Sequence, residues 1–136
     1  MKSKTIIASA LLFLGVLAGC KKYEEGPALS LRSKNARVAN TWKVESYTIN
    51  ASDYTSELTS INYTETYDKD GNYSYSSTFD TGSGKWEFQS DKMEIKRSGV
   101  SGQSTESLHI LCLKHKKFWY YYMDGSDRHE FHLVPN

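Results

Sequence analysis

The stretch that decides the fold is INYTETYDKDGNYSYSSTF, residues 61–79. In both of its halves aromatic and apolar residues alternate with polar ones, the period of a half-buried β-strand. The residues that share a face are Ile61, Tyr63 and Tyr67 in the first half, and Tyr73, Tyr75 and Phe79 in the second. Between the halves, Lys69-Asp70-Gly71-Asn72 suits a tight turn because Asp-Gly tolerates positive φ. The stretch therefore predicts a β-hairpin.

The same alternation continues along the chain and predicts eight strands. They cover 41–50, 61–67, 72–79, 85–89, a short run around Met93 and Ile95, 106–114, 117–123 and 128–134. We read Thr81-Gly82-Ser83-Gly84 as a turn and 99–104 as a flexible stretch. One piece alone looks helical, Ser33 to Ala39, where Ser33 would cap the helix and Val38 would pack inward. Sequential strands without helical crossovers predict an antiparallel barrel or a strongly curved meander rather than a parallel sheet. Since closure removes exposed edges, we expect an all-β, up-and-down eight-stranded barrel with a short N-terminal helix.

The first nineteen residues have the layout of a secretory signal peptide. Lys2 and Lys4 precede an apolar run from Ile6 to Ala18, and small residues follow at Ala18 and Gly19. At about 1.5 Å per residue this run is too short to cross an apolar layer of about 30 Å comfortably. We expect residues 1–19 to be removed from the mature protein.

The end of this signal, Leu17-Ala18-Gly19-Cys20, resembles the bacterial lipobox. The resemblance implies that diacylglycerol is attached to the Cys20 thiol, that the chain is cut before Cys20, and that the new amine receives a fatty acyl chain such as palmitate. Two or three acyl chains make a durable membrane anchor. The alternative is an ordinary secreted protein in which Cys20 happens to lie beside the cleavage site.

Residues 20–35 are polar, with Gly26-Pro27 as a breaker, and are expected to form a lipidated tether. Their start, Lys21-Lys22-Tyr23-Glu24-Glu25, resembles the export signal that sends lipoproteins of Bacteroidetes to the outer face of the outer membrane. The alternative is a plain charged linker. The expected location is the outer membrane, with lipid anchoring and exposure at the cell surface.

Residues 36–136 form the expected barrel domain. The charge of the mature chain as a whole excludes one class of partner. Without Lys2 and Lys4 the chain keeps 15 of its 17 basic side chains, against 16 acidic ones. No net positive field remains to attract a polyanion. We therefore expect no binding to nucleic acid.

Several motifs of the barrel region together resemble one protein family. They are Thr41-Trp42-Lys43-Val44, the Asp70-Gly71 hairpin, Gly84-Lys85-Trp86-Glu87-Phe88 and the tyrosine-rich run at 118–122. Over Arg37 to Pro135 the chain resembles the lipocalin-like lipoproteins of Bacteroidetes. The resemblance implies a calycin-type barrel with room for a ligand, closed at one end by Trp42. Asn40 stands where lipocalins usually have glycine.

Candidate catalytic and metal-binding groups are weak. In His129-Glu130-Phe131-His132, strand alternation puts Glu130 and His132 on one face and His129 on the other, too few ligands for zinc. We expect His109 to share a face with Leu111 and Leu113, and Cys112 to be a small core residue. No nucleophile elbow, phosphate loop or paired carboxylate is present. The sequence predicts no enzyme, no metal and no cofactor.

The strongest remaining feature is Phe118-Trp119-Tyr120-Tyr121-Tyr122, which places aromatic rings on both faces of one strand. The inward set could line a pocket, the outward set could be a contact surface, or both could form cross-strand pairs that stabilise the sheet. Our first hypothesis is that the barrel binds a small hydrophobic or amphipathic ligand. The expected lining residues are Trp42, Tyr63, Tyr73, Tyr75, Trp86, Phe88, Tyr120 and Tyr122. The alternative is a structural module with a filled core that contacts another envelope or host protein.

Overall fold

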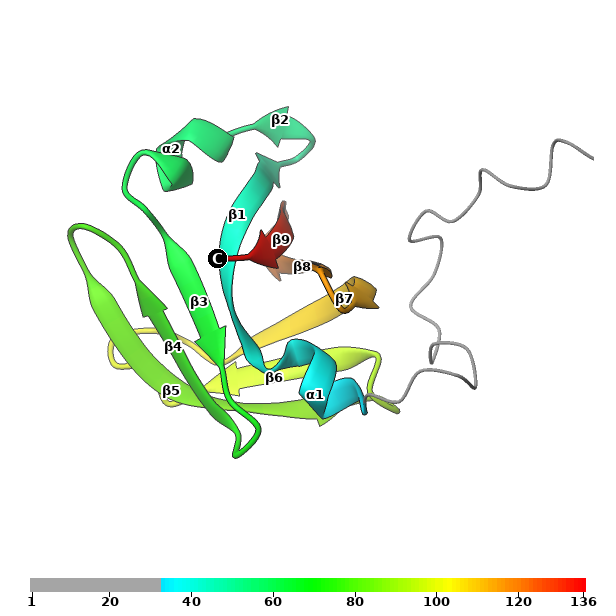
Figure 1. Cartoon of the computed structure of the whole chain (residues 1–136). Coiled ribbons are helices and arrows are strands. Elements are labelled where there is room, and N and C mark those ends of the chain that lie inside the picture. Colours follow the sequence, from blue (N-terminus) through cyan, green and yellow to red (C-terminus); the bar gives the residue numbers. More distant parts are fainter. Residues whose placement is uncertain (1–32) are drawn as a thin grey trace, which may run out of the picture.

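The computed structural model describes residues 33–136, which form a closed antiparallel barrel (Figure 1). The eight barrel strands are β1 (Asn40–Ile49), β3 (Thr64–Tyr67), β4 (Asn72–Ser76), β5 (Thr81–Gln89), β6 (Glu94–Ser98), β7 (Glu106–Lys114), β8 (Lys117–Asp124) and β9 (Asp127–Pro135). Each strand pairs with the next, and β1 also pairs with β9, which closes the barrel. The two-residue β2 (Ser52–Asp53) pairs with the end of β1. The predicted up-and-down eight-stranded barrel is confirmed.

The hairpin that led to this prediction is present between β3 and β4. Tyr67 pairs with Tyr73, and Gly71 in the turn has a φ of 89°. The Asp68 carboxylate accepts hydrogen bonds from the backbone N–H groups of Asp70 (2.9 Å) and Asn72 (2.8 Å). These bonds hold the turn in shape, as expected of an aspartate at this position.

The prediction that residues 81–84 form a turn was wrong, because they begin β5. Gly82 pairs with Tyr75, and the ring of Tyr75 lies directly against it. A Cβ atom at Gly82 would come within 2.3 Å of that ring, and one at Gly84 within 2.4 Å of the Ser98 carbonyl oxygen. Glycine is therefore required here for close packing rather than for a turn. The predicted strands over 61–67 and 72–79 were also too long, since residues 61–63 and 77–79 lie outside β3 and β4.

The predicted N-terminal helix is α1 (Lys34–Val38), which lies at one end of the barrel (Figure 1). The Ser33 hydroxyl caps it by accepting a hydrogen bond from the Ala36 N–H (3.2 Å). Val38 is fully buried, and its carbonyl accepts a 2.8 Å hydrogen bond from the Trp42 indole N–H. This end of the barrel is thus closed by packing and by a buried hydrogen bond.

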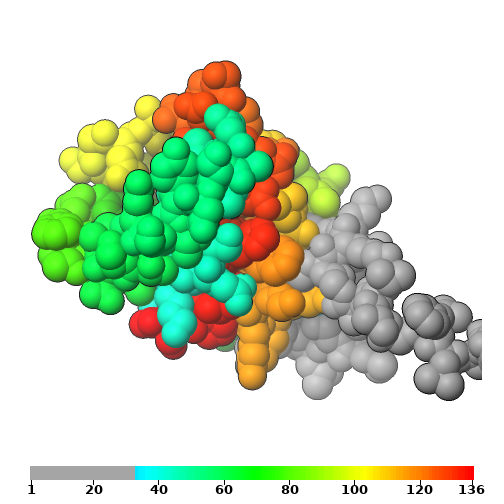
Figure 2. Space-filling model, turned by 90° about the horizontal axis from the view of Figure 1, so that it is seen from above, coloured from blue at the N-terminus to red at the C-terminus, as the bar shows by residue number. Residues whose placement is uncertain are grey.

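The expectation of a single helix was wrong, because α2 (Thr55–Thr59) follows β2. The helix has five residues, too few to show a helical period. Its start is fixed by Asp53, whose carboxylate accepts hydrogen bonds from the N–H (2.9 Å) and hydroxyl (2.6 Å) of Thr55. Leu58 packs against the hydrophobic core. Seen from above, the segment that carries α2, coloured green to teal, lies towards the viewer (Figure 2).

A β-bulge in β7 changes the face on which its last residues lie. The pairing of β7 with β8 shifts between Ile110 and Cys112. Before the bulge His109 pairs with Tyr121; after it Leu113 pairs with the fully buried Phe118 and is itself buried. The expectation that His109, Leu111 and Leu113 share a face was therefore wrong, because the extra residue reverses the alternation.

Within residues 33–136 no helix is long and apolar enough to cross a membrane. The predicted signal peptide, the lipidation site Cys20 and tether residues 20–32 lie outside the described residues.

Candidate functional site

The centre of the barrel contains an ion pair that the sequence did not lead us to expect. The Arg97 guanidinium lies 3.1 Å from the Glu65 carboxylate, and the two residues are 6% and 0% exposed. Glu65 projects inward because it occupies the same face of β3 as Tyr67, which is also buried. Isolated acidic residues on strands are normally solvated, and on that ground Glu65 was not a candidate.

Four tyrosine hydroxyls surround this ion pair, and we call the six residues the Arg97 cluster: Glu65, Arg97, Tyr63, Tyr67, Tyr73 and Tyr120. Glu65 accepts hydrogen bonds from the hydroxyls of Tyr63 (2.9 Å), Tyr67 (2.9 Å) and Tyr120 (2.7 Å). Arg97 Nη1 donates to the hydroxyls of Tyr67 and Tyr73, both at 3.1 Å.

Burial raises the pKa values of the tyrosine hydroxyls in this cluster. The pKa is raised well above its ordinary value at Tyr63, Tyr67 and Tyr120, where the nearby Glu65 carboxylate adds to the effect of burial and Arg97 opposes it. These hydroxyls therefore remain protonated and act as hydrogen-bond donors to Glu65. A buried ion pair satisfied in this way is costly to break from one side only.

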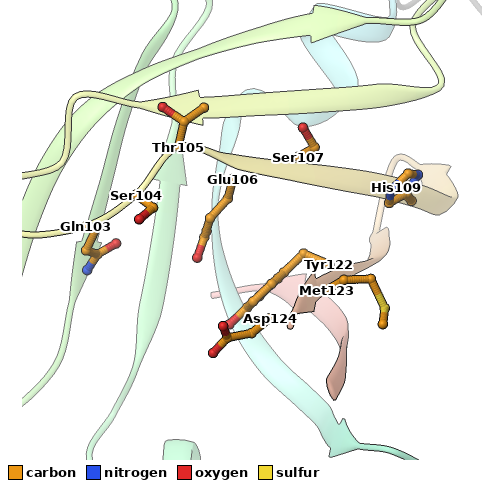
Figure 3. Close-up of a pocket in the computed structure, with 9 residues that line it drawn as sticks. All are labelled: Gln103, Ser104, Thr105, Glu106, Ser107, His109, Tyr122, Met123 and Asp124. Atoms are coloured by element: carbon orange, nitrogen blue, oxygen red, sulfur yellow. The ribbon is translucent and has the colours of Figure 1, made fainter. Parts of the chain in front are cut away.

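Glu106 connects the Arg97 cluster to the surface. Arg97 Nη2 donates to Oε2 of Glu106, whose side chain is 28% exposed. Glu106 also lines a pocket of about 410 Å³. Figure 3 shows this pocket, with the Glu106 carboxylate pointing from β7 towards Tyr122 and Asp124.

The pocket lies where β7 and β8 separate. Their pairing runs from Lys114 and Lys117 to His109 and Tyr121, so residues 106–108 and 122–124 lie beyond it. Residues 106–108 pair with β6 and residues 122–124 with β9 instead. The pocket is lined from β7 by Glu106, Ser107 and His109, from β8 by Tyr122, Met123 and Asp124, and from the preceding loop by residues 103–105. The pocket thus lies in the wall of the barrel, between β7 and β8.

Tyr122 forms part of this opening. Its ring stacks on His129 at 4.9 Å between centroids, and His129 Nδ1 lies 2.8 Å from the Tyr47 hydroxyl. Burial, reinforced by the charge of Glu106, raises the pKa of the Tyr122 hydroxyl. The hydroxyl is therefore neutral at physiological pH.

The structure brings some of the eight predicted lining residues together and separates others. Tyr63, Tyr73 and Tyr120 meet in the Arg97 cluster, and Tyr122 lines the β7–β8 pocket. Tyr75 stacks against Tyr63 at 6.2 Å and donates to Asp80 (2.8 Å). Trp42 is buried at the closed end, whereas Trp86 packs on Phe88 and donates to the Asp68 carbonyl (2.9 Å).

The predicted alternation of rings along β8 is confirmed. Phe118 and Tyr120 are fully buried inside. On the outer face Trp119 stacks on His132 at 4.0 Å, and Tyr121 stacks on His109 at 4.7 Å. The Arg128 guanidinium also lies 3.7 Å from the centroid of the Tyr121 ring. The outer rings thus form cross-strand pairs that cover part of their own surface.

The expected arrangement of the 129–132 segment is also present. His132 and Glu130 share a face, with His132 Nε2 and Glu130 Oε1 2.8 Å apart, whereas His129 contacts Tyr47. Among the described residues no three His, Cys, Asp or Glu side chains are grouped as metal ligands. Cys112 is 1% exposed.

Comparisons with protein-family models and with curated proteins found no match to this chain. Its function must therefore be argued from its own residues.

Proposed function

We propose that this protein is a lipid-anchored, outer-membrane or cell-surface protein of the lipocalin-like type that binds a small amphipathic ligand without catalysis. The observation that carries the proposal is the β7–β8 pocket, which opens beside a buried cluster of charged and hydroxyl groups. Its volume of about 410 Å³ lies within the range of small-molecule sites, roughly 300–1,000 Å³.

The lining of the pocket favours an amphipathic ligand over a purely apolar one. Tyr122 and Met123 supply apolar surface, while Glu106, Asp124 and the hydroxyls of residues 104, 105 and 107 supply polar atoms. The Arg97 cluster occupies the barrel centre, so a ligand placed at the β7–β8 opening keeps the core packing intact. Burial of its apolar part would contribute about 25 cal/mol per Å².

Ligand binding is tested with N-phenyl-1-naphthylamine, an uncharged fluorescent probe whose emission rises in an apolar site. We expect saturable binding that Tyr122→Ala abolishes. Phe79→Ala is the matched control, because Phe79 is 82% exposed and lies outside the pocket. Binding that is unchanged in Tyr122→Ala, or equally weakened in Phe79→Ala, would show that the pocket is not the site.

The anchor rests on the Leu17-Ala18-Gly19-Cys20 motif. Intact mass measurement of protein extracted with detergent from its native membrane should show a chain that begins at Cys20 and carries acyl groups. Cleavage elsewhere, an unmodified Cys20, or a peptide in which Cys20 is joined to Cys112 would contradict lipid anchoring.

The second candidate is a non-catalytic structural or protein-interaction module with a filled core. The close packing of two predicted lining residues, Trp42 and Tyr120, against Phe118 favours it. The ring centroid of Phe118 lies 5.7 Å from that of Trp42 and 5.2 Å from that of Tyr120. Such a module would contact another envelope or host protein. Native mass spectrometry distinguishes the two candidates, since only the first predicts a small molecule that leaves on mild organic extraction.

A further inference from the structure

The lining of the β7–β8 pocket is rich in hydrogen-bond acceptors. Its two carboxylates, Glu106 and Asp124, accept hydrogen bonds and cannot donate them. The hydroxyls of residues 104, 105 and 107 do both. No lysine, arginine or tryptophan, the side chains that only donate, lines the pocket. The lining therefore matches a ligand group that donates hydrogen bonds.

The two carboxylates come from opposite sides of the pocket and lie on its inner face. Glu106 shares a face of β7 with the buried Leu108, and Tyr122 and Asp124 share a face of β8 with the buried Tyr120. In Figure 3 the Glu106 carboxylate, the Tyr122 hydroxyl and the Asp124 carboxylate converge between the two strands. A ligand group placed there has a carboxylate on either side.

The positive charge closest to these carboxylates does not cancel them. Arg97 is buried behind Glu106, outside the pocket lining, and it forms ion pairs with both Glu65 and Glu106. One guanidinium thus faces two carboxylates, which leaves one negative charge in excess. The Asp124 side chain makes no hydrogen bond or ion pair with another described residue, so its charge is uncancelled.

The basic side chains on the strands around the pocket are held elsewhere. His129 lies behind the Tyr122 ring, and its Nδ1 is 2.8 Å from the Tyr47 hydroxyl. Three other basic groups are each paired with a carboxylate: His109 with Glu94 (3.2 Å), Arg128 with Glu130 (3.0 Å) and Lys96 with Glu87 (3.8 Å). The field in the pocket is therefore negative, which favours a cation and repels an anionic head group.

The lining also distinguishes among kinds of cation. A quaternary ammonium has no N–H donor and is typically bound by a cage of several aromatic rings. Tyr122 is the one Phe, Tyr or Trp residue that lines this pocket. Among the described residues no three His, Cys, Asp or Glu side chains are grouped as metal ligands. A primary ammonium, by contrast, has three donors for the carboxylates, and such charge-assisted hydrogen bonds are stronger than neutral ones.

We propose that the β7–β8 pocket binds the primary ammonium group of a cationic amphipathic molecule. The ammonium donates to the carboxylates of Glu106 and Asp124, and the apolar part of the molecule packs against Tyr122 and the half-exposed Met123. This inference rests on the proposed function, because it names the charge and the polar group of the ligand bound at that site.

The test is a titration of ¹⁵N-labelled protein with probes that share a hexyl-length chain and differ in the head group. They are hexylamine (a primary ammonium at neutral pH), hexyltrimethylammonium (a cation without N–H donors), hexanol (neutral) and hexanoate (anionic). The amide chemical shifts of Glu106, Tyr122 and Met123 report binding. We expect hexylamine to bind at least about tenfold more tightly than hexanol and hexyltrimethylammonium, and hexanoate to cause no shift.

A matched pair of variants assigns the effect to the pocket. Asp124→Asn leaves the Arg97 cluster intact and should weaken hexylamine binding at least about tenfold, with hexanol binding unchanged. Asp91→Asn is the control, because it removes the same charge from an exposed position in the turn between β5 and β6, outside the pocket. We expect Asp91→Asn to bind hexylamine like the unmodified protein.

Three results would each refute the ammonium assignment: equal binding of hexylamine and either hexanol or hexyltrimethylammonium, binding of hexanoate, or an equal effect of Asp124→Asn and Asp91→Asn. Absence of hexylamine binding would refute it too. Binding of N-phenyl-1-naphthylamine that Tyr122→Ala abolishes would then still support the proposed function. Failure of every probe, N-phenyl-1-naphthylamine included, would refute the pocket as a binding site.

Discussion

Replacement of Arg97 by methionine tests whether the buried Glu65 carboxylate destabilises the barrel when its positive partner is removed. Methionine has a similar length but no charge, so Glu65 would remain fully buried with only its tyrosine donors. Removal of one partner from a buried ion pair typically costs about 3–5 kcal/mol of unfolding free energy. Because three hydroxyls still bond to Glu65, we expect the lower end, about 3 kcal/mol.

The assay is urea-induced unfolding followed by tryptophan fluorescence, with thermal unfolding as a second measurement. For a domain of this size a loss of 3 kcal/mol corresponds to a fall in Tm of roughly 12–24 °C. The matched control is Lys96→Met, one residue away on the opposite face of β6, where Lys96 and Glu87 form an exposed pair at 3.8 Å. Exposed pairs contribute about 0–1 kcal/mol.

A double variant separates the ion pair from simple loss of packing. Glu65→Gln combined with Arg97→Met leaves no uncompensated charge at the barrel centre, since the other partner of Arg97, Glu106, is 28% exposed. The double variant should therefore recover part of the stability lost in Arg97→Met. Two outcomes would refute the mutual dependence of the buried pair. One is that Arg97→Met lowers the unfolding free energy no more than Lys96→Met. The other is that the losses of unfolding free energy from Arg97→Met and Glu65→Gln simply add in the double variant.

Three further predictions concern the frame around the cluster. Gly82→Ala should lower the unfolding free energy by about 1–3 kcal/mol through overpacking against the Tyr75 ring; strictly additive losses in urea unfolding when Tyr75→Ala is added would contradict the clash. Trp42→Phe removes the indole bond to α1 and should cost about 1–3 kcal/mol, with faster hydrogen exchange in α1; unchanged exchange would show that the bond does not hold α1. Hydrogen bonds from the Asn72 backbone and side chain lower the pKa of Asp68, so its contribution to stability is present above the unfolded-state pKa of about 3.9 and is lost as the pH falls through the lower folded-state value. Asp68→Asn should reduce the loss of Tm below about pH 4, and parallel acid limbs in the two proteins would refute this.

The strand order was predictable because each strand shows a two-residue alternation of apolar and polar side chains and is separated from the next by turn residues. The bounds of β7 match the predicted 106–114, since a loop and a two-residue turn enclose a clear alternation. The β7 bulge could not be predicted, because its position depends on the pairing with β8 and leaves no local mark in the sequence. For the same reason the separation of β7 from β8, and with it the pocket, was not visible.

The Arg97 cluster shows a different limit. The position of Glu65 between Tyr63 and Tyr67 on one face was visible in the sequence, and so was the shared face of Ile95 and Arg97. What the sequence lacked was the contact between them, which spans 32 residues and forms only when the barrel curves β3 towards β6. A charged residue on an otherwise aromatic strand face is therefore a signal worth following in similar chains.

The pairing of β1 with β9, which closes the barrel, also determines when this chain can complete its fold during synthesis. β9 pairs with both β1 and β8, so the ring of strands is complete only after residues 127–135 have been made. Until then β1 and β8 each have one edge without a hydrogen-bonding partner. The partner of β1 at this edge is β9, in which His129 lies 82 residues after its contact Tyr47. A nascent chain that engaged an export channel before that point would still be unfolded enough to pass through it. Deletion of β9 should cause aggregation rather than formation of a smaller barrel, because the edges of β1 and β8 would stay unpaired.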